Sequence, residues 1–191
     1  SLYWFVCCCC FYDSDGGELV SYISIRRQRQ LCIRDRIKDQ YKSDAQQLSL
    51  EELLYNAGLT DNAAEKEDIY KTTTKLFSND ARAFNNLATL AYQRGDYSAA
   101  KSYAEKALAI DANSADAKAN LGLIALTEGN VAKAENLISQ ASGASNIQEA
   151  LGNLHIAQGK YAQAEQDLAN INSNSAALAQ ILNKNYSAAA S

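Results

Sequence analysis

A pattern of about 34 residues recurs in the second half of the chain and limits its possible folds more than any other feature. Three glycines, Gly95, Gly129 and Gly159, are separated by 34 and then 30 residues. Eight residues before each glycine stands a leucine followed by a small residue, and five residues after each stands an alanine. These are Leu87-Ala88, Leu121-Gly122 and Leu151-Gly152, with Ala100, Ala134 and Ala164. Three copies in one register predict three equivalent structural units.

Each copy contains two stretches whose apolar residues recur at helical spacing, separated by the glycine. In the first copy the predicted inward residues are Phe84, Leu87, Ala88 and Ala91, then Tyr97, Ala100, Ala104, Ala107 and Leu108. Asp80 is a predicted N-cap for the first of these helices. The same spacing along the chain predicts helices at 49–58, 63–77, 81–94, 97–110, 115–128, 131–141, 146–158, 161–169 and 175–183.

The composition agrees with an all-α fold. The chain has no proline, which would interrupt helices, and it is rich in alanine, the strongest helix former. At 191 residues it is long enough to bury a core. A formal net charge of −4 argues against a nucleic-acid surface, which needs a basic face, and we therefore expect no nucleic-acid partner.

The repeated motif, L-[GA]-x-x-[AYH]-x-x-x-G-x-[YV]-x-x-A, resembles that of the tetratricopeptide repeat. The resemblance implies a right-handed superhelical stack of antiparallel helix pairs over residues 48–191. It divides this stretch into a degenerate repeat (48–80), repeats at 81–114, 115–144 and 145–172, and a partial repeat (173–191). The family's usual tryptophan position holds Phe84, Lys118 or Gln148. The second repeat is four residues short, so we expect its second helix to lose about one turn.

The first 36 residues differ abruptly in composition from the rest. They contain all five cysteines (Cys7–Cys10 and Cys32) and the only tryptophan, Trp4. Residues 26–36, RRQRQLCIRDR, resemble the translation of a transposase adapter used in sequencing libraries, with Leu31 as the one departure. A basic nucleic-acid patch or a localisation signal is the competing reading. We expect residues 1–36 to be non-native and disordered and to pack on nothing specific. Their five cysteines therefore do not indicate whether the protein works in an oxidising or a reducing compartment.

Residues 37–47 are a predicted linker or lead-in helix. Together with LSLEELLYNAGLT they resemble the C-terminal repeat region of Bacteroidota envelope proteins, in which an outer-membrane-protein-A-like, peptidoglycan-binding domain can precede the repeats. This resemblance implies the periplasm or cell envelope rather than the cytoplasm. Because the chain lacks an initiator methionine and stops inside a repeat, we expect a fragment of a longer protein. The sequence after residue 36 contains no predicted membrane span.

Successive hairpins of such a stack form a concave groove lined by the first helix of each repeat. By resemblance, the groove candidates are Arg82, Asn85, Asn86, Thr89, Tyr92, Gln93, Asp116, Asn120, Leu123 and Asn153. The same positions also hold Ala119, Leu126, Thr127, Asn146, Glu149, Ala150, Ile156 and Ala157. Asparagine amides suit an extended peptide because they pair with both backbone donors and acceptors; the alternative is that they are simply solvated. The family's carboxylate clamp is absent, since Asn85 and Ala150 stand where it needs Lys and Arg.

No catalytic arrangement is evident in the sequence. His155 is the only histidine and occupies a position inside a predicted hairpin, where packing is the expected role. There is no Gly-rich phosphate loop, HExxH or GxSxG motif, and the adjacent cysteines lack zinc-ligand spacing. We therefore expect no enzyme activity, no cofactor and no metal.

The predicted function is a protein-interaction scaffold that binds a peptide or partner protein in the groove. The alternative is a passive spacer or capping array attached to a missing upstream cell-envelope domain. A scaffold should present a contiguous apolar and amide face, whereas a spacer should present scattered charge.

Overall fold

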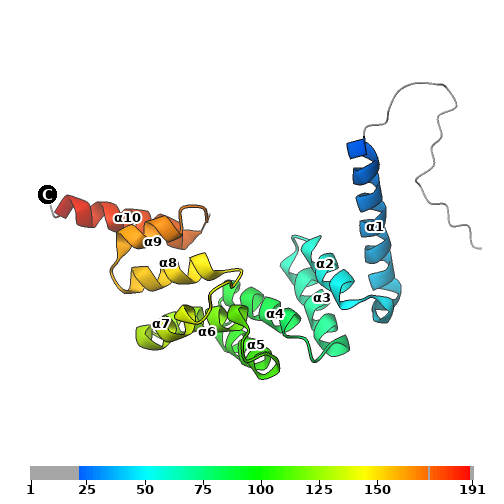
Figure 1. The fold of residues 1–191 in the computed structure, drawn as a ribbon, viewed down its shortest axis with the longest axis horizontal. Helices are drawn as coiled ribbons and strands as arrows, with labels where there is room; N and C mark the ends of the chain where they lie inside the picture. Colours follow the sequence, from blue (N-terminus) through cyan, green and yellow to red (C-terminus); the bar gives the residue numbers. More distant parts are fainter. Residues whose placement is uncertain (1–21, 172, 190–191) are drawn as a thin grey trace, which may run out of the picture. The chain divides into compact units, whose positions relative to one another are not determined.

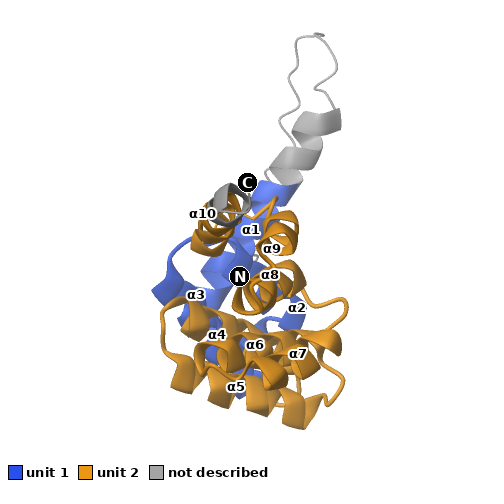
Figure 2. Ribbon diagram, turned by 90° about the vertical axis from the view of Figure 1, so that its left-hand side faces the viewer, with its two compact units in different colours: residues 1–76 blue, residues 77–191 orange. Residues whose placement is uncertain are grey.

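The computed structural model describes residues 22–171 and 173–189, and over these ranges the chain consists of ten α-helices and one short 3-10 helix (Figure 1). The chain divides into two compact units, Ser1–Leu76 and Phe77–Ser191 (Figure 2). We call them unit 1 and unit 2 and describe each by itself.

Unit 1 contains α1 (Tyr22–Asp44), the 3-10 helix η1 (Ala45–Gln47), α2 (Leu50–Gly58) and α3 (Ala63–Leu76). The start of α2 has a reciprocal cap: Ser49 Oγ accepts from the Glu52 amide at 3.3 Å, and Glu52 Oε2 accepts from the Ser49 amide at 3.0 Å. Leu53 and Ala57 of α2 and Ile69 of α3 are buried where the two helices pack together.

Helix α1 corrects the prediction for the first segment. Residues 22–36, expected to be disordered, are helical, because YISIRRQRQLCIRDR contains neither glycine nor proline and many good helix formers. The expectation that this segment packs on nothing specific is also wrong at its end, where Arg36 pairs with Glu52 at 3.0 Å. Trp4 and Cys7–Cys10 lie outside the described residues.

Unit 2 consists of seven described helices, from green to red in Figure 1. They are α4 (Ala81–Gln93), α5 (Tyr97–Ile110), α6 (Ala115–Thr127), α7 (Val131–Ser139), α8 (Ile147–Ala157), α9 (Tyr161–Asp167) and α10 (Asn174–Ala189). The predicted helices are confirmed in number and position from residue 49 onward, and the main difference is that α10 continues past residue 183 to Ala189. The expected shortening of the second repeat is confirmed: α7 has 9 residues where α5 has 14.

The three repeat glycines form the turns between first and second helices. Their φ angles are +82°, +77° and +75°, the left-handed region that glycine adopts without steric cost. At the first turn the Gly95 amide donates to the Tyr92 carbonyl and the Asp96 amide to the Ala91 carbonyl, both at 2.9 Å. This Schellman pattern recurs at Gly129 and Gly159. The chain therefore reverses direction in the same way three times.

The helices of unit 2 form two layers. The first helices α4, α6, α8 and α10 are successive neighbours, and α5, α7 and α9 each pack against the first helices before and after them. The contacts within a pair are close: a Cβ on Gly122 would lie 2.6 Å from Ile138 Cγ1, and one on Gly152 would overlap Leu168. Small residues at this position therefore set the spacing between the two layers.

The core of unit 2 is largely as predicted. Leu87, Ala88, Ala91, Ala100, Ala104 and Ala107 are buried, whereas Phe84 and Leu108 are half-buried. Tyr97, expected to be buried, is 44% exposed, because its ring leans on Tyr92 at the turn and leaves one face in solvent.

Candidate functional site

A ladder of carboxamide side chains crosses the first helices of unit 2. It begins at Asn85 on α4, whose side chain is 6% exposed and whose Nδ2 donates to Ser114 Oγ at 2.9 Å. Ser114 is the N-cap of α6 and also accepts from the Ala117 amide at 3.3 Å. The Asn85–Ser114 hydrogen bond therefore connects the N-terminus of α6 to α4.

Asn120 on α6 forms the next step of the ladder. It is 2% exposed; its Nδ2 donates to the Asn85 backbone carbonyl at 3.3 Å, and its Oδ1 accepts from Asn146 Nδ2 at 2.9 Å. Thr89 Oγ1 lies 3.3 Å from the same Oδ1 and 3.1 Å from the Asn85 carbonyl. The ladder therefore joins α4, α6 and the residue that precedes α8.

The ladder fixes which amide atom is the acceptor in Asn120 and in Asn146. A backbone carbonyl can only accept, so the group of Asn120 facing Asn85 must be the NH₂ group, and its other atom must be Oδ1. Asn146 must then donate to it with Nδ2, which leaves Asn146 Oδ1 as an acceptor. That oxygen is buried without a hydrogen-bond partner among the described residues, and so is Asn85 Oδ1.

Asn146 stands at a helix N-cap but does not cap the helix with its side chain. It is the N-cap residue of α8, where an asparagine side chain normally accepts from a backbone amide of the first turn. Here it makes no such capping bond, because the side chain turns to Asn120 instead. Helix α8 therefore lacks a side-chain capping hydrogen bond, and Asn146 Oδ1 remains an unpaired acceptor within the first-helix layer.

A second polar contact lies beside the ladder. Asp116 Oδ1 accepts from the Ser145 amide at 2.7 Å and from Ser145 Oγ at 2.8 Å. The loop before α8 is thus bound to the first turn of α6. This contact holds Asn146, the next residue, in place.

Tyr92, near the C-terminal end of α4, supplies the aromatic part of the candidate site. Its ring packs against Tyr97 with centroids 5.5 Å apart and planes tilted by 56°. Burial raises the pKa of Tyr92 to about 12, and the negative charge of Glu149 and then Tyr97 add to the shift. The hydroxyl therefore remains a protonated donor throughout the physiological range.

The ten predicted groove residues do not form one uniform surface. The structure joins Asn85, Thr89 and Asn120 directly in the ladder and places Asp116 beside it. Leu123 is in the hydrophobic core, so its prediction as a groove residue is wrong: at that register α6 is covered on both sides. Asn86 and Asn153 are half-buried, Gln93 is exposed, and Arg82 is exposed and paired with Asp80 at 3.1 Å.

Ser114 and Ser145 are the members of this network that sequence reasoning missed. Both lie in the loops before first helices, outside the repeat positions that resemblance assigns to the groove. Ser114 had a detectable signal, since a serine directly before a predicted helix is a common N-cap. Nothing in the spacing of Ser145 indicates its bond to a residue 29 positions away.

His155 belongs to α8, and its side chain contacts α9 on the inside of the hairpin, as predicted. Its Nδ1 is 2.6 Å from Asp167 Oδ2, and both side chains are about four-fifths buried. Among the described residues no hydroxyl or thiol is hydrogen-bonded to the other ring nitrogen, as nucleophilic catalysis by such a pair would require. The pair is therefore interpreted as a structural polar contact that connects α8 to α9 within the hairpin.

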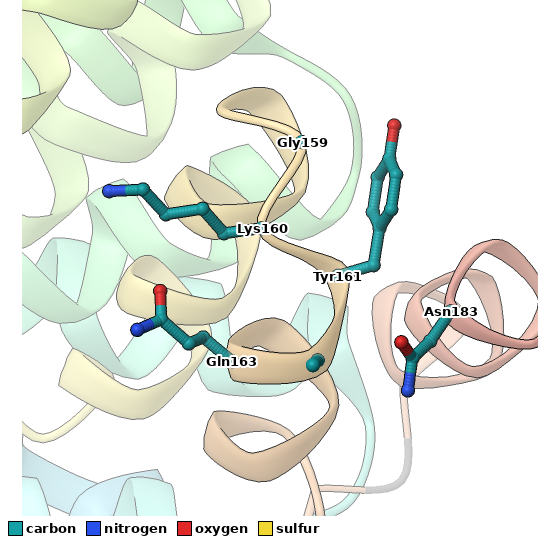
Figure 3. A pocket seen from close by; sticks show the side chains of 6 residues that line it. Gly159, Lys160, Tyr161, Gln163 and Asn183 are labelled. Carbon is teal, nitrogen blue, oxygen red and sulfur yellow. The ribbon is translucent and has the colours of Figure 1, made fainter. Parts of the chain in front are cut away.

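A pocket opens between the start of α9 and α10 (Figure 3). It is lined by Gly159, Lys160, Tyr161, Ala162, Gln163 and Asn183. Lys160 and Gln163 extend to one side of the helix start, and Tyr161 and Asn183 lie on the other. Asn183 Nδ2 already donates to Glu165 at 2.6 Å, so the pocket has fewer free polar groups than its lining suggests.

The described residues contain no group of three or more His, Cys, Asp or Glu side chains arranged to hold a metal. Over the same residues no helix has the length and apolar character needed to cross a membrane.

Comparison with known proteins agrees with this fold. Residues 91–146 match the family model of the tetratricopeptide repeat, whereas no curated protein matches the chain significantly. A tetratricopeptide repeat protein from Parabacteroides merdae ATCC 43184 is similar in structure, with a TM-score of 0.59 and 15% identity over 88% of this chain and 73% of that one. The MamA protein has a TM-score of 0.53 and 18% identity over 84% and 90% of the two chains.

The crystal structure of the Cut9–Hcn1 hetero-tetramer of the APC/C is also similar, with a TM-score of 0.59 and 17% identity. That similarity covers 82% of this chain but 32% of the other, so this chain spans about a third of that protein's length. Identities this low compare the fold alone. Residues 91–146 thus match the tetratricopeptide repeat family model, and unit 2 has the fold of such repeats, an all-α stack of antiparallel helix pairs with three hairpins in register.

Proposed function

We propose that the chain is a non-catalytic scaffold that holds an extended peptide segment of a partner protein along the first-helix layer of unit 2. Tetratricopeptide repeat folds serve protein interaction in general, because stacked hairpins present a long continuous surface. The finer proposal, a peptide on the ladder, is supported by one observation in particular. The ladder ends on Asn146 Oδ1, a buried acceptor whose orientation is dictated by Asn85 and Asn120.

The chemistry of this acceptor selects the class of ligand. A buried carboxamide oxygen is stabilised by a donor, and a peptide backbone offers N–H donors at regular intervals. Because Asn146 Oδ1 has almost no accessible surface in the unbound chain, the proposal requires the Asn146 side chain to shift towards the surface when the peptide binds. Half-buried apolar groups of the same helices, Tyr92 and Leu126, pack at the edge of the adjoining core and offer contact area for a ligand side chain. A connected set of amides beside apolar groups is what distinguishes a binding face from scattered surface charge.

The experiment uses a displayed library of random 12-residue peptides selected against the immobilised full chain. Enriched peptides are then titrated by fluorescence anisotropy against the wild-type chain, Asn146→Ala and Asn136→Ala. Asn146→Ala removes the acceptor without removing a helix cap, because Asn146 makes no capping bond. Asn136 is an exposed asparagine on α7, in the other layer, and its substitution is the matched control.

We expect Asn146→Ala to weaken binding at least tenfold and Asn136→Ala to leave it within a factor of two. If no peptide is enriched, or if both variants bind as the wild type does, the peptide-binding proposal is wrong. The passive spacer then becomes the better reading.

A further inference from the structure

The first turn of α8 holds a carboxylate that has no partner among the described residues. Glu149 is the third residue after the N-cap Asn146, the position from which a glutamate often bonds back to the N-cap amide. Glu52 makes this bond in α2, where it accepts from the Ser49 amide at 3.0 Å. Glu149 is half-buried, and within the described part of the chain it makes neither this bond nor an ion pair. Its negative charge is therefore available to a group outside the chain.

The charges around Glu149 make this end of the ladder negative. Asp116, at the start of α6, is bound by neutral donors alone, the amide and the hydroxyl of Ser145. Arg82, the one basic residue among the predicted groove residues, is paired with Asp80 at 3.1 Å. Two carboxylates thus lie at this end of the first-helix layer, and no described lysine or arginine forms an ion pair with either of them.

Tyr92 adds an aromatic ring beside this charge. It packs at the edge of the core cluster to which α8 contributes Ala150, the residue after Glu149, and Leu154. Burial and then the charge of Glu149 raise the pKa of Tyr92 to about 12, which places the carboxylate near the phenol. A carboxylate next to the ring of a tyrosine attracts the cationic head of a lysine or an arginine, by charge and by the cation–π interaction.

Given the peptide binding proposed above, we propose that the bound segment is basic, with an arginine or lysine side chain that pairs with Glu149 and lies over the ring of Tyr92. Glu149 is three residues after Asn146, so the two side chains lie one helical turn apart on the same side of α8. A peptide backbone at Asn146 therefore brings one of its own side chains within reach of Glu149. The ladder holds the backbone of the ligand, and Glu149 with Tyr92 selects one of its side chains.

The experiment uses the tightest of the enriched 12-residue peptides and a copy in which citrulline replaces each arginine and norleucine each lysine. Both are titrated by fluorescence anisotropy against the wild-type chain, Glu149→Gln and Glu135→Gln. Glu149→Gln removes the charge and keeps the shape of the side chain. Glu135 is an exposed glutamate on α7, in the other layer, and is the matched control. Circular dichroism checks that both variants keep their helix content.

We expect the wild type and Glu135→Gln to bind the basic peptide at least fivefold more tightly than its neutral copy, and Glu149→Gln to bind the two within a factor of two. In the unaltered chain, the preference for the basic peptide should shrink as the salt concentration rises. If Glu149 only stabilises the first turn of α8, Glu149→Gln weakens both peptides equally, and the basic-ligand proposal is wrong.

The outcomes separate this proposal from the peptide binding on which it rests. Enriched peptides that lose affinity for Asn146→Ala but share no arginine or lysine overturn the basic-ligand proposal and leave the scaffold proposal in place. A preference for the basic peptide that persists in Glu149→Gln does the same. If no peptide is enriched, both proposals are wrong.

Discussion

At the scale of single residues, the same side-chain type has different roles according to its neighbours. Asn130 caps α7 by accepting from the Lys133 amide at 3.0 Å, whereas Asn146, at the same position of α8, binds Asn120. Periodicity placed Asn85 and Asn120 on the first-helix layer correctly but gave no sign that they are buried. Their burial depends on how closely α4, α6 and α8 approach one another, and spacing within one helix carries no information about that distance.

Leu87 tests the register of the repeat. It is 1% exposed between α4 and its neighbours, so Leu87→Ala should reduce the free energy of unfolding by about 2–4 kcal/mol. Leu178→Ala is the matched control, since it makes the same change at the equivalent but half-exposed position of α10. Urea unfolding at low micromolar concentration measures both. A loss below about 0.5 kcal/mol for Leu87→Ala would mean that the register is wrong.

Tyr92 predicts a stability loss at alkaline pH. Its pKa is raised to about 12, above the value of about 10 for a tyrosine in an unfolded chain, so the folded state holds the proton more tightly. The resulting stabilisation is fully present below pH 10 and is lost as the pH rises from 10 towards 12. Unfolding by urea from pH 8 to pH 11 should show this decline, and Tyr92→Phe should make it shallower. An unchanged slope would show that Tyr92 titrates normally.

At the scale of elements, the boundaries in unit 2 follow from local signals, and such signals also account for the helix over residues 22–36 of unit 1, where disorder was expected. Glycine turns and the caps Asp80, Asp96 and Asn130 mark where helices begin and end, and each accepts a backbone amide as its residue type predicts. The resemblance of residues 26–36 to a translated adapter predicts disorder for residues 22–36, whereas their helix propensity predicts a helix. The physical signal, an uninterrupted run of helix formers continuing into residues 37–44, pointed to the helix.

Gly152 tests the spacing between the two helices of a pair. A Cβ there overlaps Leu168, so the gain in helix propensity is outweighed and Gly152→Ala should destabilise the chain by about 1–2 kcal/mol. Gly58→Ala is the control: it is also a helical glycine, but an added Cβ meets nothing within 4 Å. Thermal unfolding of both should show a lower Tm for the first and an equal or higher Tm for the second. Equal effects would contradict close packing at Gly152.

At the scale of the whole molecule, each hairpin of unit 2 contacts mainly the next, so stability should be distributed along the array rather than shared uniformly. The family resemblance supplied this architecture from sequence. The ladder and the His155–Asp167 pair could not be derived in the same way. They depend on contacts between helices.

If stability is distributed along the array, a destabilising substitution should increase amide hydrogen exchange only in the helices near it. Leu168→Ala, which empties the α9 side of one hairpin, should accelerate amide hydrogen exchange in α8, α9 and α10 while leaving α4 and α5 protected. Exchange followed by mass spectrometry resolves these segments. A uniform increase across unit 2 would instead indicate that the array unfolds as one cooperative body.

The turn glycines have a consequence for the handedness of the backbone. At Gly95, Gly129 and Gly159 a Cβ would meet nothing within 4 Å, yet φ lies near +80°. Space is available there, so the positive φ rather than the size of a side chain disfavours L-residues other than glycine. A mirror-image amino acid prefers these angles, so D-alanine introduced by chemical ligation should fit without strain and narrow the unfolded ensemble. At these turns the L-configuration of the encoded amino acids, rather than a lack of space, is what favours glycine.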